Sequence, residues 1–294
     1  MQRETEIIVA KGAGFCFGVK RAVDIAFKNA NTSRVFTLGP IIHNPQVVQR
    51  LVDMGVTPLE GLVLSDIKAS DTIIIRTHGV PVDTLEALKK TGCSIIDATC
   101  PFVKKAQDHA KALAQRGYQV LIIGDRDHPE VKGLVSYAGD DVVVVSSEDE
   151  VGKLKNRVGI VVQTTQPVDI LKRVVQSVLQ RVKELVVYNT ICSSTDLRLK
   201  ETMRLTDKVE AIFVVGGRNS ANTTQLTRLC RSKNIPTYHI ETVSEIQDSW
   251  LRGINKIGIT AGASTPDWII NEVIDRIKYR GGNGQYGSTA KRGD

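Results

Sequence analysis

The sequence predicts an α/β protein built from three similar units, each containing a parallel β-sheet. Short apolar runs alternate with helical patterns along almost the whole chain, which is typical of parallel sheets covered by helices. Polar residues follow the apolar runs, at the strand ends where such sheets bind ligands. Cys16, Cys100 and Cys192 are almost evenly spaced, and each follows an apolar run and precedes a helical pattern. We therefore expect a pseudo-threefold arrangement with one cysteine per unit near its centre.

The individual elements are predicted from runs rich in valine and isoleucine and from the amphipathic patterns between them. The expected strands are residues 7–10, 34–38, 72–76, 94–96, 119–124, 141–145, 157–162, 185–188, 211–215, 236–240 and 256–260. The expected helices are residues 19–29, 46–54, 83–91, 104–116, 131–137, 168–184, 195–209, 223–233 and 267–279. Pro101 suits a first helical turn, where its missing N–H has no helical partner. Cys100 is therefore expected at a strand-to-helix junction.

The order of the polar residues divides the chain into units. The set is His43, His78 and Cys100, then His128, Thr164 and Cys192, then Asn222 and Ser264. The third group lacks a cysteine, but Cys16 supplies one if the N-terminal strand joins that unit. We expect units at residues 18–100, at 101–192, and at 193–280 together with 1–17. The Gly-rich polar tail, 281–294, is predicted to be disordered.

The composition is that of a globular protein with a basic surface. The 294 residues carry 39 Lys and Arg against 32 Asp and Glu, a net charge of +7. No apolar run approaches the ~20 residues of a membrane helix. The first residues lack the apolar core of a signal peptide, so we expect a cytoplasmic protein. The basic residues are scattered and aromatic residues are few, which argues against nucleic-acid binding and leaves a solvated surface or an acidic partner.

The cysteines predict a metal site, because disulfides are rare in a reducing compartment. The start of a helix lowers the pKa of a thiol, and a Cys-Pro step such as Cys100-Pro101 closes many iron–sulfur ligand runs. Three matching cysteines favour a cluster with one open iron over structural zinc, which takes four ligands. A zinc site completed by histidines stays open as an alternative, with His43, His78 and His128 as its candidates.

The remaining cysteines and histidines are expected to be structural. Cys93, expected to begin a strand, and Cys230, on a helix, have the positions of small core residues. His109 and His239 lie within a predicted helix and a predicted strand. None of these four residues is expected to take part in the site.

Candidate acid and anion-binding residues occur in the strand-end loops. Glu130 follows His128 by two residues, and a carboxylic acid beside a histidine can relay a proton, or it can simply stabilise a helix start. Loops 216–222 and 261–266 precede helices, where amides and hydroxyls suit phosphate oxygens, unless Ser and Asn only cap those helices. Together these residues indicate reductive or Lewis-acid chemistry on a phosphorylated small molecule.

Nine short motifs, in order from about residue 7 to 279, resemble the 4-hydroxy-3-methylbut-2-enyl diphosphate reductase (IspH/LytB) family. The motifs are Gly-Phe-Cys-Phe-Gly-Val (14–19), Ile-His-Asn (42–44), Thr-His-Gly-Val (77–80), Asp-Ala-Thr-Cys-Pro (97–101), His-Pro-Glu-Val-Lys-Gly (128–133), Gln-Thr-Thr (163–165), Ile-Cys-Ser-Ser-Thr (191–195), Asn-Ser-Ala-Asn (219–222) and Ala-Gly-Ala-Ser-Thr-Pro-Asp (261–267). The family catalyses the last step of the non-mevalonate (MEP) isoprenoid pathway.

The resemblance implies three α/β units around a central [4Fe–4S] cluster. Cys16, Cys100 and Cys192 would hold the cluster and leave one iron open to the substrate hydroxyl. The implied catalytic residues are Glu130, His128 and Thr164. The implied substrate-binding residues are His43, His78, His128, Thr164, Thr165, Ser220, Ala221, Asn222 and Ser264. The implied reaction is a reductive dehydroxylation of (E)-4-hydroxy-3-methylbut-2-enyl diphosphate that takes two electrons and two protons and releases water. Its products are isopentenyl diphosphate and dimethylallyl diphosphate.

Ala221 departs from the pattern of this family, which commonly has Ser-Ser-Asn where this chain has Ser220-Ala221-Asn222. The alanine lacks the hydroxyl but keeps its backbone N–H. We expect the change to affect the affinity for the diphosphate and not the reaction.

Two other classes of protein compete with the reductase. A non-catalytic iron–sulfur regulator that binds nucleic acid would need a recognition helix or a basic cluster, and the sequence shows neither. A zinc hydrolase of a phosphorylated substrate would contain zinc and have no redox activity. For the reductase, the basic charge and the lack of a nicotinamide fingerprint predict an acidic ferredoxin or flavodoxin as electron donor, with no nucleic-acid or membrane partner.

Overall fold

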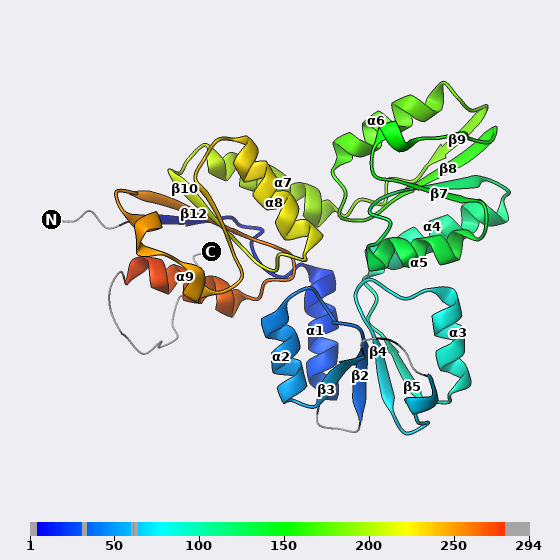
Figure 1. Ribbon diagram of the computed structural model, residues 1–294, viewed down its shortest axis with the longest axis horizontal. Helices are drawn as coiled ribbons and strands as arrows, with labels where there is room; N and C mark the ends of the chain where they lie inside the picture. The colour runs from blue at the N-terminus through cyan, green and yellow to red at the C-terminus, as the bar shows by residue number, and fades with distance from the viewer. Residues whose placement is uncertain (1–4, 31–33, 60, 62–63, 280–294) are drawn as a thin grey trace. The chain divides into compact units, whose positions relative to one another are not determined.

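Three four-stranded parallel sheets organise the computed structural model, which describes residues 5–30, 34–59, 61 and 64–279. The chain divides into two compact units. The terminal unit contains the described residues of Met1–Cys16, His43–Pro45 and Leu197–Asp294, and the central unit contains those of Phe17–Ile42 and Gln46–Asp196. Two of the sheets lie in the central unit and one in the terminal unit (Figure 1).

The first sheet of the central unit has the strand order β3-β2-β4-β5. Its strands are β2 (Val35–Leu38), β3 (Val56–Leu59), β4 (Thr72–Ile75) and β5 (Ser94–Asp97). The helices of this part of the chain are α1 (Phe17–Asn29), α2 (Pro45–Asp53) and α3 (Val82–Lys90). Ile73 and Ile75 pack in one buried cluster with Leu88 of α3, because side chains alternate between the two faces of a strand.

The second sheet of the central unit has the order β7-β6-β8-β9. Its strands are β6 (Gln119–Ile123), β7 (Val142–Val145), β8 (Arg157–Val162) and β9 (Glu184–Val187). The helices are α4 (Pro101–Gln115), α5 (Pro129–Ala138) and α6 (Val168–Leu179). Val120 and Ile122 pack in a cluster with α4 and α5, whereas Leu121 and Ile123 pack in a cluster with α6. This sheet is therefore the buried middle layer of three.

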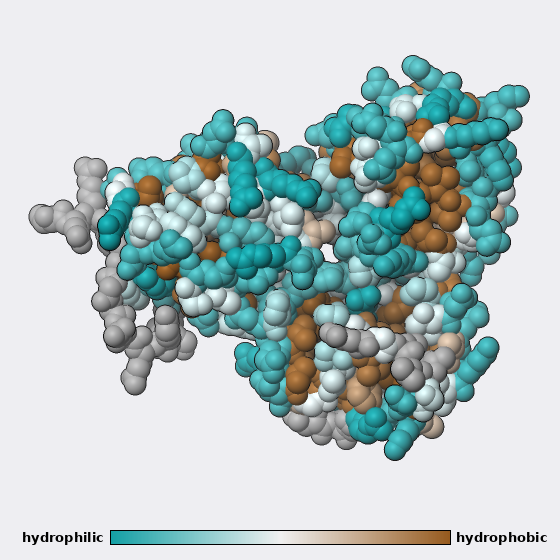
Figure 2. All heavy atoms as spheres, viewed as in Figure 1, coloured by the Kyte–Doolittle hydropathy of each residue, from teal (hydrophilic) through white to brown (hydrophobic). Residues whose placement is uncertain are grey.

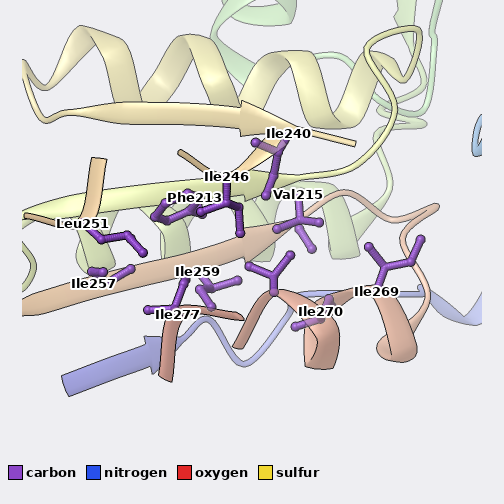
Figure 3. Close-up of a cluster of buried hydrophobic side chains, with 12 residues drawn as sticks. Phe213, Val215, Ile240, Ile246, Leu251, Ile257, Ile259, Ile269, Ile270 and Ile277 are labelled. Atoms are coloured by element: carbon purple, nitrogen blue, oxygen red, sulfur yellow. The ribbon is translucent and has the colours of Figure 1, made fainter. Parts of the chain in front are cut away.

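The sheet of the terminal unit has the order β1-β12-β10-β11. Its strands are β1 (Glu6–Val9), β10 (Ala211–Val215), β11 (Thr237–Ile240) and β12 (Lys256–Ala261). The helices are α7 (Ser193–Thr206), α8 (Ala221–Ser232) and α9 (Asp267–Lys278). Phe213 and Val215 pack toward α9 in the cluster drawn in Figure 3. Ile212 and Val214 pack in a second cluster with Leu205 of α7 and Leu226 of α8.

The three sheets share one topology, and this confirms the predicted α/β class of three similar parallel-sheet units. In each sheet the chain forms an inner strand, then the strand on its outer side, and then a second inner strand beside the first. The fourth strand lies at the other edge, as β5, β9 or β1. The N-terminal strand completes the third sheet as predicted, since Ile7 of β1 pairs with Ile257 of β12. The division into three domains stays a prediction, and the tail 281–294 lies outside the described residues.

The main differences from the prediction are one shorter helix and one strand that was not predicted. The helix expected over 168–184 ends at Leu179, because the backbone N–H groups of Lys183 and Glu184 donate to the carbonyl oxygen of Asn156 and begin β9 there. Strand β3 was not predicted, since Pro58 interrupts its apolar pattern. The proline is tolerated because β3 is an edge strand, where a missing donor can face away from the sheet.

The structure also contains four short 3₁₀ helices that the sequence pattern did not indicate. They are η1 (Leu64–Asp66), η2 (Glu148–Glu150), η3 (Val243–Glu245) and η4 (Asp248–Leu251). Hydrophilic residues cover most of the visible face of the terminal unit in Figure 2, whereas hydrophobic residues also show on the visible face of the central unit. None of the helices in the described ranges combines the length and the apolar character needed to cross a membrane.

Candidate active site

The predicted site residues occupy equivalent positions at the carboxyl ends of the three sheets. His43 follows β2 and His78 follows β4 in the first sheet; Glu130 follows β6 and Thr164 follows β8 in the second. Asn222 follows β10 and Ser264 follows β12 in the third. Each pair comes after the two inner strands, whose connections leave in opposite directions. This is where open α/β sheets bind ligands.

The three cysteines also occupy equivalent positions, after the edge strand of each sheet and directly before a helix. Cys16 lies between β1 and α1, Cys100 between β5 and α4, and Cys192 between β9 and α7. The N–H groups of Cys100 and Cys192 each donate to a carbonyl oxygen after the neighbouring inner strand, at 2.9 Å. The N–H of Cys16 donates to a carbonyl oxygen after β12 at 3.3 Å.

These three thiols have the properties of metal ligands. None of the three is in a disulfide, all three are partly exposed, and each directly precedes a helix. The predicted junction at Cys100 is confirmed, because Cys100 caps α4 and Pro101 begins it. The two other cysteines differ. Cys230 is fully buried and burial raises its pKa to about 12, as expected of a core thiol, while Cys93 is only half-buried and directly precedes β5.

Glu130 is a buried acid held by a single neighbour. Its side chain is 1% exposed, and its carboxylate accepts hydrogen bonds from the N–H of Thr164 at 2.6 Å and from the Thr164 hydroxyl at 2.9 Å. Burial raises the pKa of Glu130 to about 7, and the two hydrogen bonds from Thr164 oppose this rise. A carboxyl group with such a pKa can both give and take a proton near neutral pH.

His128 and Glu130 are placed by the start of α5. His128 caps the helix through its ring, since Nδ1 accepts a hydrogen bond from the N–H of Glu130 at 3.2 Å. The neutral ring therefore carries its proton on Nε2. Pro129 occupies the first helical position, which its fixed backbone suits. The ring of His78 lies edge-on to that of His128, with 5.3 Å between the ring centroids.

The polar loops of the terminal unit form a buried rim at the starts of α8 and α9. Ser220 caps α8 by accepting from the N–H of Thr223. The side-chain oxygen of Asn222 accepts from the N–H of Ala263 at 3.1 Å, and the hydroxyl of Ser264 donates to the carbonyl oxygen of His43 at 3.2 Å. Ser220, Asn222 and Ser264 are 5–6% exposed. Hydroxyls and amides at a helix start suit the oxygens of a phosphate.

The structure thus brings the predicted residues together in two sets. Glu130, Thr164, His128 and His78 lie in the central unit, together with Cys100 and Cys192, whereas His43, Ser220, Ala221, Asn222 and Ser264 lie in the terminal unit with Cys16. Thr165 lies in the central unit, where its hydroxyl accepts from the side-chain amide of Gln163 at 3.1 Å. His109 stacks on Tyr188 and His239 hydrogen-bonds the carbonyl oxygen of Gly216, and the structural roles expected for both stay a prediction.

Sequence reasoning missed the polar residues that support these sets. Gln163 is 1% exposed, and its side-chain oxygen accepts from the N–H of Asp125 at 2.9 Å, which ties together the loops after β6 and β8. Thr223 is fully buried against Gly216 and Gly262. Arg198 is a buried guanidinium on α7. Thr223 shares a helical face with Leu226 and Cys230, which was an available signal. Gln163 lies in a loop, and the local pattern of α7 does not indicate a buried arginine, so no signal in the sequence indicated these two residues.

The fold and these two sets of residues define an α/β protein with a buried acid, with polar groups at helix starts and with three cysteines at its strand ends. A family model described as LytB protein matches residues 7–278. The chain therefore belongs to the LytB family.

Relatives and solved structures agree with this membership. The 4-hydroxy-3-methylbut-2-enyl diphosphate reductase of Geobacter sp. (strain M21) is 52% identical over 275 residues, which cover 92% of this chain and 96% of that protein. The protein of the same name from Geobacter sulfurreducens (strain ATCC 51573 / DSM 12127 / PCA) is 51% identical over 278 residues, 93% of this chain and 97% of that one.

Two solved structures are similar over nearly their whole length. A structure of (E)-4-hydroxy-3-methyl-but-2-enyl diphosphate reductase, the terminal enzyme of the non-mevalonate pathway, has a TM-score of 0.72 and 46% identity, and the match covers 93% of this chain and 99% of that one. The E-1-hydroxy-2-methyl-but-2-enyl-4-diphosphate reductase from Plasmodium falciparum has a TM-score of 0.86 and 25% identity, with coverages of 98% and 95%.

Proposed function

We propose that this chain reduces (E)-4-hydroxy-3-methylbut-2-enyl diphosphate to isopentenyl diphosphate and dimethylallyl diphosphate. Membership of the LytB family and about 50% identity to reductases named for this substrate support the activity. One observation carries it to the residues. Thr164 accepts a hydrogen bond from the N–H of Cys192 through its carbonyl oxygen and donates its own N–H to Glu130. The candidate metal ligand Cys192 and the candidate proton donor Glu130 are thus both hydrogen-bonded to Thr164. A reaction that uses electrons and protons together requires such proximity.

We assign the cofactor as one [4Fe–4S] cluster held by Cys16, Cys100 and Cys192. The support is chemical: three thiols outside any disulfide repeat at one position of three like-folded sheets, each at a helix start. Cluster irons take thiolate ligands, and a cubane with three cysteines keeps one iron without a protein ligand. When bound, the cluster supplies the electrons and a Lewis-acidic iron.

One of the two protons is assigned to the acid group of the central unit. Loss of the allylic hydroxyl as water consumes one proton at that oxygen, and the second proton goes to the carbon framework of the product. We assign the first proton to Glu130, whose raised pKa keeps a proton on it up to about pH 7. When Glu130 carries its proton, the acid can donate to the Thr164 oxygen, and the Thr164 hydroxyl hydrogen then becomes available to the substrate oxygen. The Nε2–H of His128 is the second neighbouring donor.

The diphosphate is assigned to the rim residues and the two histidines of the first sheet. Ser220, Asn222 and Ser264 offer hydroxyl and amide groups at a helix start, and His43, His78, His128, Thr164 and Thr165 complete the predicted set. Ala221 is the first residue of α8 and contributes only its backbone N–H, so the affinity for the diphosphate is expected to be lower than with serine there.

The test is to purify the protein without oxygen and to measure iron, acid-labile sulfide and the Mössbauer spectrum, with and without the allylic diphosphate. A [4Fe–4S] spectrum in which one iron changes on adding substrate, together with formation of the two products, is the expected result. Zinc in place of iron, with release of phosphate and no reduction, would instead establish the hydrolase.

Gly18→Ala is expected to weaken the cluster site through Cys100. A Cβ atom at Gly18 would lie 2.5 Å from the Cys100 Sγ and 3.2 Å from its Cβ, so the thiol must move. We expect less iron per chain while the far-ultraviolet circular dichroism stays unchanged. Gly152→Ala is the matched control, since nothing lies within 4 Å of a Cβ atom there. Equal iron in both variants would contradict the expectation.

We assign the electron donor as an acidic ferredoxin or flavodoxin, on the basis of the net charge of +7. Attraction between opposite charges speeds the encounter of two proteins and weakens with salt. The turnover rate with such a donor is therefore expected to fall steeply between low and high salt, while the rate with a small chemical reductant changes little. A donor-dependent rate that ignores salt would count against this partner.

A further inference from the structure

A buried charged side chain on helix α7 hydrogen-bonds to the loop that carries Cys16. Arg198 is 4% exposed, and its guanidinium donates from Nε to the carbonyl oxygen of Gly12 and from Nη2 to that of Gly14, both at 2.8 Å. Glu201, one turn further along α7, accepts from the N–H of Gly12 at 2.6 Å. We call Arg198 and Glu201 the α7 clamp.

The loop is shaped to accept this clamp. A Cβ atom at Gly12 would lie 2.8 Å from the Glu201 Oε2, so any larger residue would push the carboxylate away. Gly14 has a φ of +102°, a backbone conformation that suits glycine, and a Cβ atom there would meet Asp267 of α9 at 2.9 Å. Glycine therefore occupies both positions, 12 and 14, whose backbone groups are hydrogen-bonded to the α7 clamp.

Burying a guanidinium is costly unless its donors are satisfied, so an arginine is a poor choice for filling space alone. Here the planar fork reaches two carbonyl oxygens two residues apart, which a single lysine ammonium does not match. The hydrogen bonds fix the course of residues 12–14, and Cys16 follows two residues later. The N–H of Cys16 then donates to the carbonyl oxygen of Ala263.

Helix α7 itself begins directly after Cys192. The helix is therefore joined to Cys192 through the chain and to the Cys16 loop through three hydrogen bonds. We propose that Arg198 and Glu201 are positioning residues that hold Cys16 ready as a metal ligand. The proposal rests on the assignment of Cys16 as a cluster ligand, although the positioning itself can be measured without metal.

The first measurement uses the metal-free full chain and follows alkylation of each cysteine by iodoacetamide, mapped by mass spectrometry. Arg198→Met keeps much of the length of the side chain and removes the hydrogen bonds. We expect Cys16 to react about tenfold faster in this variant, since hydrogen bonds to charged groups restrain a segment strongly. Cys100 and Cys192 should keep their rates. Arg204→Met is the matched control, because Arg204 is an exposed arginine on the same helix.

Two further variants keep the test decisive if Arg198→Met does not fold. In Gly12→Ala the new Cβ atom displaces the Glu201 carboxylate, and Arg198 itself is not replaced. This variant should also raise the reactivity of Cys16 selectively. Arg198→Lys should fall between the wild type and Arg198→Met. The thermal midpoint of the metal-free protein reports any general destabilisation.

The second measurement uses the cluster-loaded protein and follows loss of its visible absorbance to an iron chelator without oxygen. Arg198→Met and Gly12→Ala should lose the cluster about tenfold faster than Arg204→Met, and the cluster's reduction potential should shift. Cys16 alkylation and cluster loss that match the control in both variants would overturn the proposal. A wild type that binds no cluster would refute the proposed cofactor, and the alkylation rates would still decide the positioning role.

Discussion

Replacing Glu130 by glutamine is expected to lower kcat by about 10²–10⁴, the range typical for loss of a general acid. The amide keeps the shape of the side chain and an oxygen that can accept from the N–H of Thr164, and its NH₂ group can donate to the Thr164 hydroxyl. It lacks a transferable proton. The KM for the diphosphate should change little, because Glu130 is not assigned to diphosphate binding. Steady-state rates with a small reductant measure this without the protein donor.

Glu86→Gln is the matched control, because Glu86 is an exposed glutamate on α3. It should leave kcat unchanged. A Glu130→Gln enzyme with the turnover of the wild type would remove Glu130 from the proton path, and the two hydrogen bonds from Thr164 would then have only a structural role.

The raised pKa of Glu130 also fixes the sign of two pH effects. The acid form is lost as the pH rises through about 7, so kcat should fall on that side of the profile. The folded chain binds the proton more tightly than the unfolded chain, in which the pKa is 4.5. The free energy of unfolding should therefore decrease from pH 4.5 to 7, by roughly 3 kcal/mol at about 1.4 kcal/mol per pKa unit. Glu130→Gln should flatten this part of the stability profile.

The positions of the polar residues at the strand ends could be predicted from the sequence, because each position depends on residues that are close to it in the chain. An apolar run followed by a polar loop and a helical pattern places each of His128, Thr164 and Ser264 after its strand, as the structure has it. The closing of the third sheet by β1 was predictable for a different reason. The third predicted unit has no cysteine of its own, and the N-terminal strand next to Cys16 belongs to neither of the other two units. The three units therefore match when this strand joins the third unit.

The contacts that support the site could not be predicted, because they join residues far apart in the chain. Arg198 and Gly12 are 186 residues apart, and neither the spacing nor the local pattern of α7 indicates that its arginine turns inward. Glu130 could be read as a proton donor or as a helix-start carboxylate. It lies in the first turn of α5, which confirms the second description, while its role as a proton donor stays a prediction. Only its burial in the folded chain shows why its pKa rises, and the hydrogen bonds from Thr164 oppose that rise.

Replacing any one of Cys16, Cys100 and Cys192 by serine is expected to have the largest effect of all. A serine oxygen is a harder and less acidic ligand than a thiolate, and iron–sulfur clusters are held by thiolates. We expect iron and sulfide per chain to fall sharply. Turnover should drop by more than the 10–100-fold that loss of an outer-shell partner costs. Metal analysis, visible absorbance and product formation measure the three quantities on the same preparation.

Cys93→Ser is the matched control for the three serine variants. Cys93 is as partly exposed as the three proposed ligands, but it precedes β5 and lies at the amino end of the sheet, away from the strand ends that carry the site. If position after the edge strand decides which thiols bind iron, Cys93→Ser must keep its iron and its activity while all three others lose both. A serine variant that keeps its full iron content would show that the replaced cysteine is not a ligand. The assignment of one thiolate ligand to each sheet would then be wrong for that sheet.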